Sequence, residues 1–184
     1  MRPLKTFFIV FPTVLIADQV CKWAILEHVI RADGQSPRSL WSWLMHAPEK
    51  LGPNTIEVLP FFNIVMVWNY GISFGLFSSG NEWQPYILSG VALIICGILF
   101  YWLLKETRLG LMIAFSAIIG GAIGNVIDRL RFGAVADFFD FHVAGWHYPA
   151  FNIADSMIVL GVAYLLIDVL FVNHSNQQNP IVEK

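Results

Sequence analysis

Residues 120–140 read GGAIGNVIDRLRFGAVADFFD and decide the fold, because they join an apolar run to a cluster of polar side chains. The run before the cluster, residues 109–127, carries no charge and is long enough for a membrane span. The polar members of the stretch are Asn125, Asp128, Arg129, Arg131, Asp137 and Asp140. Charges attached to a membrane helix are costly unless they pair or take part in chemistry. The stretch therefore predicts a span that ends in half of an active site.

The composition of the whole chain agrees with a membrane protein. Of its 184 residues, 57% are hydrophobic and only 13% are charged, against about 25% charged in soluble domains. The formal net charge is −2 and the sequence has no basic stripe, so we expect no nucleic-acid partner. The length fits one domain, so we predict a single membrane-embedded domain over residues 1–184.

Four apolar stretches predict an α-helical integral membrane protein. The spans are expected at residues 6–27, 83–104, 109–130 and 152–172. Residues 31–82 form a long segment outside the membrane, in which residues 56–68 predict one or two strands and residues 41–44 a short interfacial helix. Residues 131–150 are expected to form a loop. Asp18 and Lys22 interrupt the first run, which favours a retained span over a cleaved signal peptide.

Basic residues set the expected orientation, because cytoplasmic segments carry an excess of lysine and arginine. The short segments on one side hold Arg2, Lys5, Lys105, Arg108 and Lys184. Both termini are therefore predicted to be cytoplasmic, and the polar cluster lies near the outer face. Arg129 and Arg131 run against this rule, which predicts a specific partner for them.

Three groups of polar residues lie at helical spacing. Asp18 and Lys22 are four residues apart on one helix face, where they form an intramembrane ion pair, support a site, or do both. Asn125, Asp128 and Arg129 share a face, where they are either a polar helix end or part of a site. Asn152 and Asp155 have the spacing of an N-cap and its third helical residue, so capping alone is an equal alternative to a functional role.

The predicted topology brings two carboxylates together. Asp137 lies just beyond the third span and Asp155 at the head of the fourth, so both fall at the outer membrane boundary. Neighbouring carboxylates tend to share one proton, so one can activate a water while the other protonates the leaving group. This is the chemistry of an aspartyl protease.

Two other patterns are weaker. Gly71-Ile-Ser73-Phe-Gly75 fits the nucleophile elbow of serine hydrolases, but the chain lacks the α/β alternation that this elbow needs. His142 and His147 lie near Asp137 and Asp140, but their spacing is not that of a zinc motif. We therefore expect neither a serine nucleophile nor a metal.

The chain resembles the lipoprotein signal peptidases, also called signal peptidase II, a family of bacterial membrane aspartyl proteases. Five motifs carry the resemblance in order along the chain: Asp18-Gln-Val-Cys-Lys22, Asn69-Tyr-Gly71-Ile-Ser-Phe-Gly75, Gly121-Ala-Ile-Gly124-Asn125-Val-Ile-Asp128-Arg129, Val135-Ala-Asp137-Phe and Phe151-Asn152-Ile-Ala-Asp155. There are two departures: Ser73 stands where the family usually has Ala, and residues 31–56 look longer than usual.

The resemblance implies that Asp137 and Asp155 are the catalytic dyad. The residues implied to bind substrate or to support the site are Asn69, Gly71, Asn125, Arg129, Asn152, Asp18, Lys22 and Asp128. It further implies a β-cradle and a short periplasmic helix over the site, both from residues 31–83, and no metal or organic cofactor. The substrate would be a diacylglyceryl-modified prolipoprotein in the bacterial inner membrane, cleaved just before the lipidated cysteine by a monomeric enzyme that globomycin inhibits.

One alternative of another class is a small ion- or proton-coupled transporter. Its relay would use Asp18, Lys22, Asn125 and Arg129. A relay should be spread across the membrane, whereas these residues gather near one face. A third possibility, a structural membrane subunit, leaves the polar clusters without a purpose.

Overall fold

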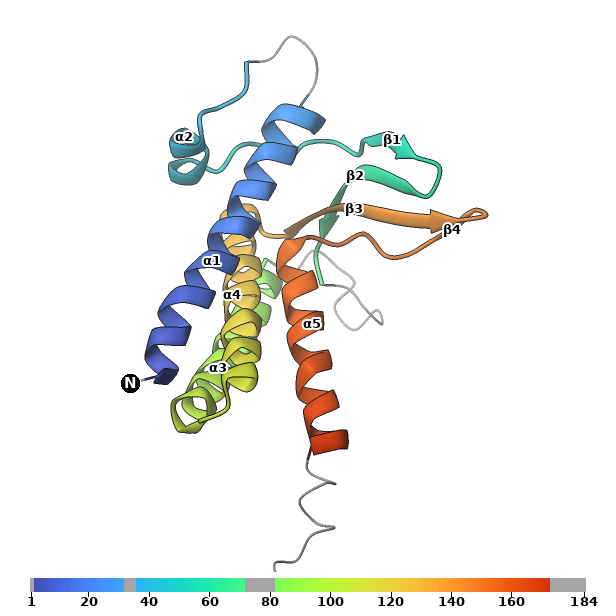
Figure 1. Ribbon diagram of the computed structural model, residues 1–184. Helices are drawn as coiled ribbons and strands as arrows, with labels where there is room; N and C mark the ends of the chain where they lie inside the picture. Colours follow the sequence, from blue (N-terminus) through green and yellow to red (C-terminus); the bar gives the residue numbers. More distant parts are fainter. Residues whose placement is uncertain (1, 32–35, 72–81, 173–184) are drawn as a thin grey trace, which may run out of the picture.

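A computed structural model describes residues 2–31, 36–71 and 82–172 of the chain. Four long helices run side by side and a small sheet lies across one end of them (Figure 1). The helices are α1 (Arg2–Ala24, continued by a π-helical turn Ile25–Ile30), α3 (Gln84–Lys105), α4 (Leu109–Phe132) and α5 (Ile153–Ile167, continued by a π-helical turn Asp168–Val172). Each is long and apolar enough to cross a membrane. The predicted fold class is confirmed.

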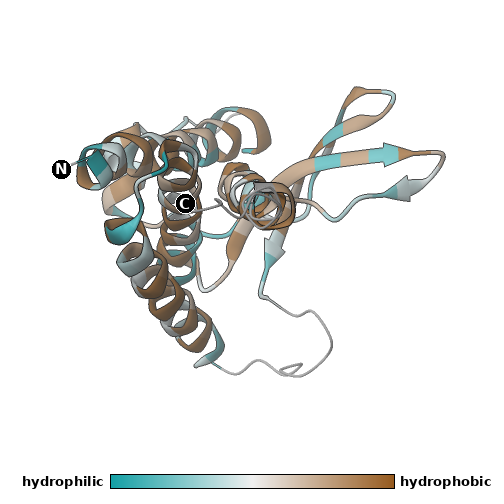
Figure 2. Ribbon diagram, turned by 60° about the horizontal axis from the view of Figure 1, so that its bottom comes forward, coloured by the Kyte–Doolittle hydropathy of each residue, from teal (hydrophilic) through white to brown (hydrophobic). Residues whose placement is uncertain are grey.

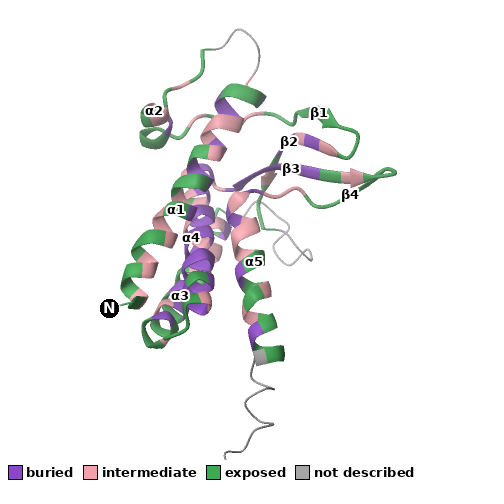
Figure 3. Cartoon of the chain, in the orientation of Figure 1, coloured by how far each residue is buried: buried purple, intermediate pink, exposed green. Residues whose placement is uncertain are grey.

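Helix α4 is the centre of the bundle and packs against α1, α3 and α5. In its most apolar window 72% of the residues are buried, against 17–28% in the other three helices, as the burial colours of Figure 3 show. The outer helices carry hydrophobic residues around most of their surface (Figure 2). Because those exposed faces are apolar, they suit contact with lipid.

The sheet is antiparallel with the strand order β1 (Thr55–Leu59), β2 (Phe62–Asn69), β3 (Val135–Val143) and β4 (Trp146–His147). The expectation of a sheet built only from residues 31–83, with a loop at 131–150, is therefore wrong. The sequence signals are present in hindsight, since Val135–Val143 is rich in aromatic and branched residues. Positive φ angles at Ala144 (50°) and Gly145 (82°) then form the tight turn of a hairpin.

Helix α2 (Leu40–Met45) confirms the short helix expected near Trp41. Its Trp43 is fully buried beside Phe132, and Arg131 lies over the Trp43 ring, 4.2 Å from its centroid, and donates a hydrogen bond to its carbonyl. Arg131 thus has the specific partner that its position predicted. In Figure 1, α2 and the sheet lie on opposite sides of α1.

Candidate active site

Asp137 is held at the junction of the sheet and the bundle. It lies on β3 opposite Val67 of β2, and the residue is only 1% exposed. Asn69, at the end of β2, donates its side-chain amide to Asp137 Oδ2 at 3.0 Å. Asn152 donates to the other oxygen, Oδ1, at 2.8 Å. Both carboxyl oxygens are therefore occupied by neutral amide donors.

Asp155 lies in the first turn of α5, where it takes part in a capping box. The Asn152 side chain accepts from the Asp155 N–H at 2.9 Å, and Asp155 Oδ2 accepts from the Asn152 N–H at 3.3 Å. The other Asp155 oxygen accepts from the Asn125 side chain of α4 at 2.7 Å. The capping alternative is therefore correct, and the same two side chains also belong to the polar cluster.

Asn152 connects the two carboxyl groups. Its side-chain amide donates to Asp137 and its backbone N–H donates to Asp155. The same side-chain amide also lies 3.3 Å from Asn125 Oδ1, so the three asparagines and the two aspartates form one continuous network.

The pKa of Asp137 reflects this environment. Burial raises it most, and the nearby Asp155 charge raises it further. The hydrogen bonds from Asn69 and Asn152 and the charge of Lys22 oppose the rise, and the net effect is a pKa of about 7. Near neutral pH the Asp137 carboxyl can therefore either hold or release a proton, which acid–base chemistry requires.

Arg129 and Gly71 lie beside this pair. Arg129 interacts electrostatically with Asp155 and Asp137, and its Nη1 donates to the Asn125 carbonyl at 3.4 Å. Its buried Nε has no hydrogen-bond partner among the described residues, so this donor remains available to a ligand. Gly71 has φ +77°, a conformation that favours glycine, and a Cβ there would lie 4.0 Å from Arg129 Nη2.

Asp18, Lys22 and Asp128 form a fully buried cluster behind the pair. Lys22 Nζ lies 2.8 Å from a carboxylate oxygen of each aspartate. Gln19 also joins the two aspartates, at 3.1 Å to Asp18 and 3.3 Å to Asp128. Sequence reasoning missed Gln19. A buried amide in an apolar span that needs partners was the signal that could have found it.

Among the described residues, neither the serine pattern nor the histidine pattern of the sequence adds a side chain to the polar network. Ser73 lies outside the described residues. His147 Nδ1 lies 2.9 Å from the Asp140 carboxylate, and its ring stacks on His142. Among the residues that the structure describes, no group of three or more histidine, cysteine or acidic side chains is arranged to hold a metal.

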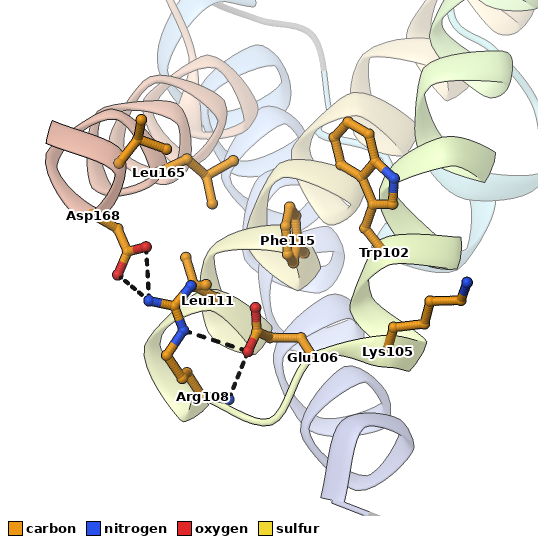
Figure 4. A pocket seen from close by; sticks show the side chains of 9 residues that line it. Trp102, Lys105, Glu106, Arg108, Leu111, Phe115, Leu165 and Asp168 are labelled. Carbon is orange, nitrogen blue, oxygen red and sulfur yellow. Dashed lines mark hydrogen bonds and ion pairs between the residues drawn. The ribbon is translucent and has the colours of Figure 1, made fainter. Parts of the chain in front are cut away.

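A hollow lies at each end of the bundle. One, of about 370 Å³, lies directly beside Asp155 and is lined mainly by apolar side chains: Tyr148, Phe151, Ser156, Val159 and Leu160. The other lies at the α3–α4 turn, where Arg108 forms ion pairs with Asp168 (2.9 Å) and Glu106 (3.5 Å) (Figure 4). Only the first hollow adjoins the polar network.

A membrane-spanning bundle with two neighbouring carboxyl groups at one end, Asp137 buried and Asp155 half-buried, fits the class of membrane-embedded aspartic-type peptidases. Comparison with known proteins agrees. The profile of the family described as Signal peptidase (SPase) II matches residues 10–171. The chain belongs to this family and is a protease.

Relatives and solved structures support the assignment. A lipoprotein signal peptidase of Vibrio cholerae serotype O1 is 45% identical over 117 residues, which cover 62% of this chain and 68% of that protein. One from Pseudoalteromonas atlantica is 45% identical over 123 residues, covering 66% and 74%. A bacterial membrane enzyme structure determined by the in meso method at 2.3 Å resolution has a TM-score of 0.70 and 30% identity, covering 97% of this chain and 95% of that one.

Proposed function

We propose that the protein is an aspartyl endopeptidase that removes signal peptides from diacylglyceryl-modified prolipoproteins. It would cleave just before the lipidated cysteine, with Asp137 and Asp155 as the catalytic dyad. The observation that carries the proposal is the connection of the two carboxyl groups through Asn152. The substrate class follows from the relatives, which are named lipoprotein signal peptidases.

In the mechanism the pair holds one proton between its two carboxyl groups near neutral pH. The ionised carboxyl removes a proton from a water, and this water attacks the scissile carbonyl. The protonated carboxyl then delivers its proton to the leaving amine. A pKa of about 7 for Asp137 supports this exchange, because the group is close to half protonated under working conditions.

Neighbouring donors would hold the substrate and stabilise the developing oxyanion. Arg129 is suited to this role because its buried Nε has no hydrogen-bond partner in the described part of the chain and its charge faces both carboxyl groups. Asn69, Asn125 and Asn152 keep the carboxyl groups oriented, and Gly71 leaves room for Leu88, whose Cδ1 lies 2.5 Å from the position that a Cβ would take.

The placement of the site suits a lipidated substrate. The hollow beside Asp155 continues onto Val159 and Leu160, which are exposed on the lipid-facing side of α5. Acyl chains can therefore stay in lipid while the scissile bond reaches the polar network. We place both termini in the cytoplasm and the site near the outer face of the bacterial inner membrane, in a single peptidase domain that functions as a monomer and is inhibited by globomycin.

The test is cleavage of a purified diacylglyceryl-modified prolipoprotein, with the product mass giving the cleaved bond. We expect Asp137→Asn and Asp155→Asn to lower turnover by about 10²- to 10⁴-fold. Asp140→Asn is the matched control, because it makes the same change three residues away on the same strand and should keep its activity. Near-normal turnover by either dyad variant would refute the assignment, and so would ion flux in liposomes without proteolysis.

A further inference from the structure

The two residues that precede the proposed dyad are held in the same way. Ala136, just before Asp137, donates its N–H to Asp128 Oδ2 at 3.2 Å. Ala154, just before Asp155, donates its N–H to Asp18 Oδ1 at 3.0 Å. Each dyad residue thus follows a peptide N–H that is fixed by a carboxylate from a different helix.

The two anchoring carboxylates are themselves joined by two bridges. Lys22 contacts both at 2.8 Å, as a charged bridge. Gln19 spans the same two carboxylates as a neutral bridge, 3.1 Å from Asp18 and 3.3 Å from Asp128. In each bridge one terminal nitrogen, Lys22 Nζ or Gln19 Nε2, contacts both carboxylates, and side chains held in this way inside an apolar bundle have little freedom to move. A displacement of one carboxylate would therefore be transmitted to the other.

We propose that Asp18, Gln19, Lys22 and Asp128 form a clamp that sets the separation and orientation of the Asp137 and Asp155 carboxyl groups. This inference rests on the proposed catalytic dyad. The four side chains are positioning residues, because they reach the dyad through other groups: the peptide N–H groups of Ala136 and Ala154, the Lys22 charge, and the hydrogen bond from Lys22 to Asn125. Gln19 is the member that closes the clamp without adding charge.

A simpler account of these side chains is charge neutralisation inside the membrane. That account requires only Asp18 and Lys22, which already satisfy each other at spacing i, i+4. It leaves Asp128 as an additional buried acid, and it gives Gln19 no role. Nor does it explain why the two anchored N–H groups are the ones next to Asp137 and Asp155.

The clamp also acts on the dyad electrostatically. The charged groups that face Asp137 come from three helices: Lys22 of α1, Arg129 of α4 and Asp155 of α5. The positive charge of Lys22 lowers the pKa of Asp137, against burial and the Asp155 charge, which raise it. Removal of the Lys22 charge should therefore move the pH dependence of cleavage upward.

The first experiment replaces Gln19 by leucine, which leaves the ion pairs in place. We expect the kcat of the folded fraction to fall, up to about 100-fold, because a misplacement of about 1 Å has an effect of that size. KM should stay within about threefold of the original value, since no substrate contact is lost. The matched control is Ser116→Ala, which removes another buried polar group, a hydroxyl that bonds to Met112 of its own helix. Its kcat should not change.

The second experiment replaces Lys22 by methionine and follows kcat/KM against pH. An upward displacement of the profile on the order of one pH unit is expected. A role in stability alone would lower the melting temperature and leave the profile in place. If this variant does not fold, the kcat of Gln19→Leu decides the matter.

An unchanged kcat for folded Gln19→Leu overturns the clamp. So does an unmoved pH profile for folded Lys22→Met. Asp137→Asn is measured in the same assay to separate the two proposals. If it is inactive while Gln19→Leu is fully active, the dyad stands and only the clamp fails. Full activity of Asp137→Asn removes the dyad itself.

Discussion

Replacement of Asp137 by asparagine should make the protein more stable at pH 8. In the folded protein, burial and the Asp155 charge raise the pKa of Asp137 from 3.8 to about 7, and a shift of this size corresponds to about 4 kcal/mol above pH 7. The direction of the pKa shift decides at which pH Asp137 stabilises the folded protein. Because the folded pKa is raised, the stabilising contribution is complete below pH 4 and is lost as the pH rises through about 7. Asparagine does not ionise, so it avoids this loss.

A lost hydrogen bond opposes part of the gain. Asn152 and Asn69 each donate to one oxygen of Asp137. An amide has one acceptor oxygen, so one of these bonds is lost at every pH, at about 1–2 kcal/mol. We therefore expect the variant to be less stable by about 1–2 kcal/mol at pH 4 and more stable by about 2–3 kcal/mol at pH 8.

The assay is thermal or denaturant unfolding in detergent micelles from pH 4 to 9. Asp140→Asn is the control of opposite sign. Burial acts to raise the pKa of Asp140, but hydrogen bonds from His147 and Asn63 outweigh it and hold this pKa below its usual value. Asp140 therefore stabilises the protein above pH 4, and its replacement should destabilise most near neutral pH. Equal destabilisation by Asp137→Asn at pH 4 and pH 8 would refute the reasoning.

Three further changes test contacts elsewhere in the structure. Gly124→Ala should destabilise the protein by about 1–3 kcal/mol, because the new Cβ would lie 2.5 Å from Asp18 Oδ2. Gly97→Ala is the control, since a Cβ there meets open space, and melting temperatures compare the two variants. Trp43→Ala should lower the free energy of unfolding by about 3–5 kcal/mol, since this side chain is fully buried; a loss below 1 kcal/mol would contradict its place in the core. Asp168→Asn should lower stability by at most about 1 kcal/mol and leave cleavage unchanged, because its partner Arg108 is half exposed and lies at the other end of the bundle.

The sequence predicted the bundle because hydropathy is a local property. A run such as residues 109–127 carries no charge, and a helix satisfies the backbone groups of a single segment within lipid. The neighbourhood of Asp137 and Asp155 was predictable for a related reason. Both lie at the same membrane boundary once the spans are placed, and the structure joins them through Asn152.

Strand β3 was harder to predict because its partner is distant. Val135–Val143 pairs with β2, about 70 residues earlier in the chain, and no local pattern encodes that pairing. Gln19 was missed for a similar reason. It stands next to Asp18 in the motif, but its value lies in spanning to Asp128 on another helix. Contacts between segments far apart in the sequence decided both cases.

The capping box of α5 has a consequence for how the enzyme is made. Asn152 and Asp155 start the last membrane helix and also complete the polar network. A chain still emerging from the ribosome, with three spans inserted, holds Asp137 but lacks the partner carboxyl and the amide that connects the pair. With Asp137 and Asp155 as the proposed dyad, proteolytic activity should arise only when the final span enters the bilayer. The order of synthesis would therefore keep the protease inactive until its last helix has been inserted.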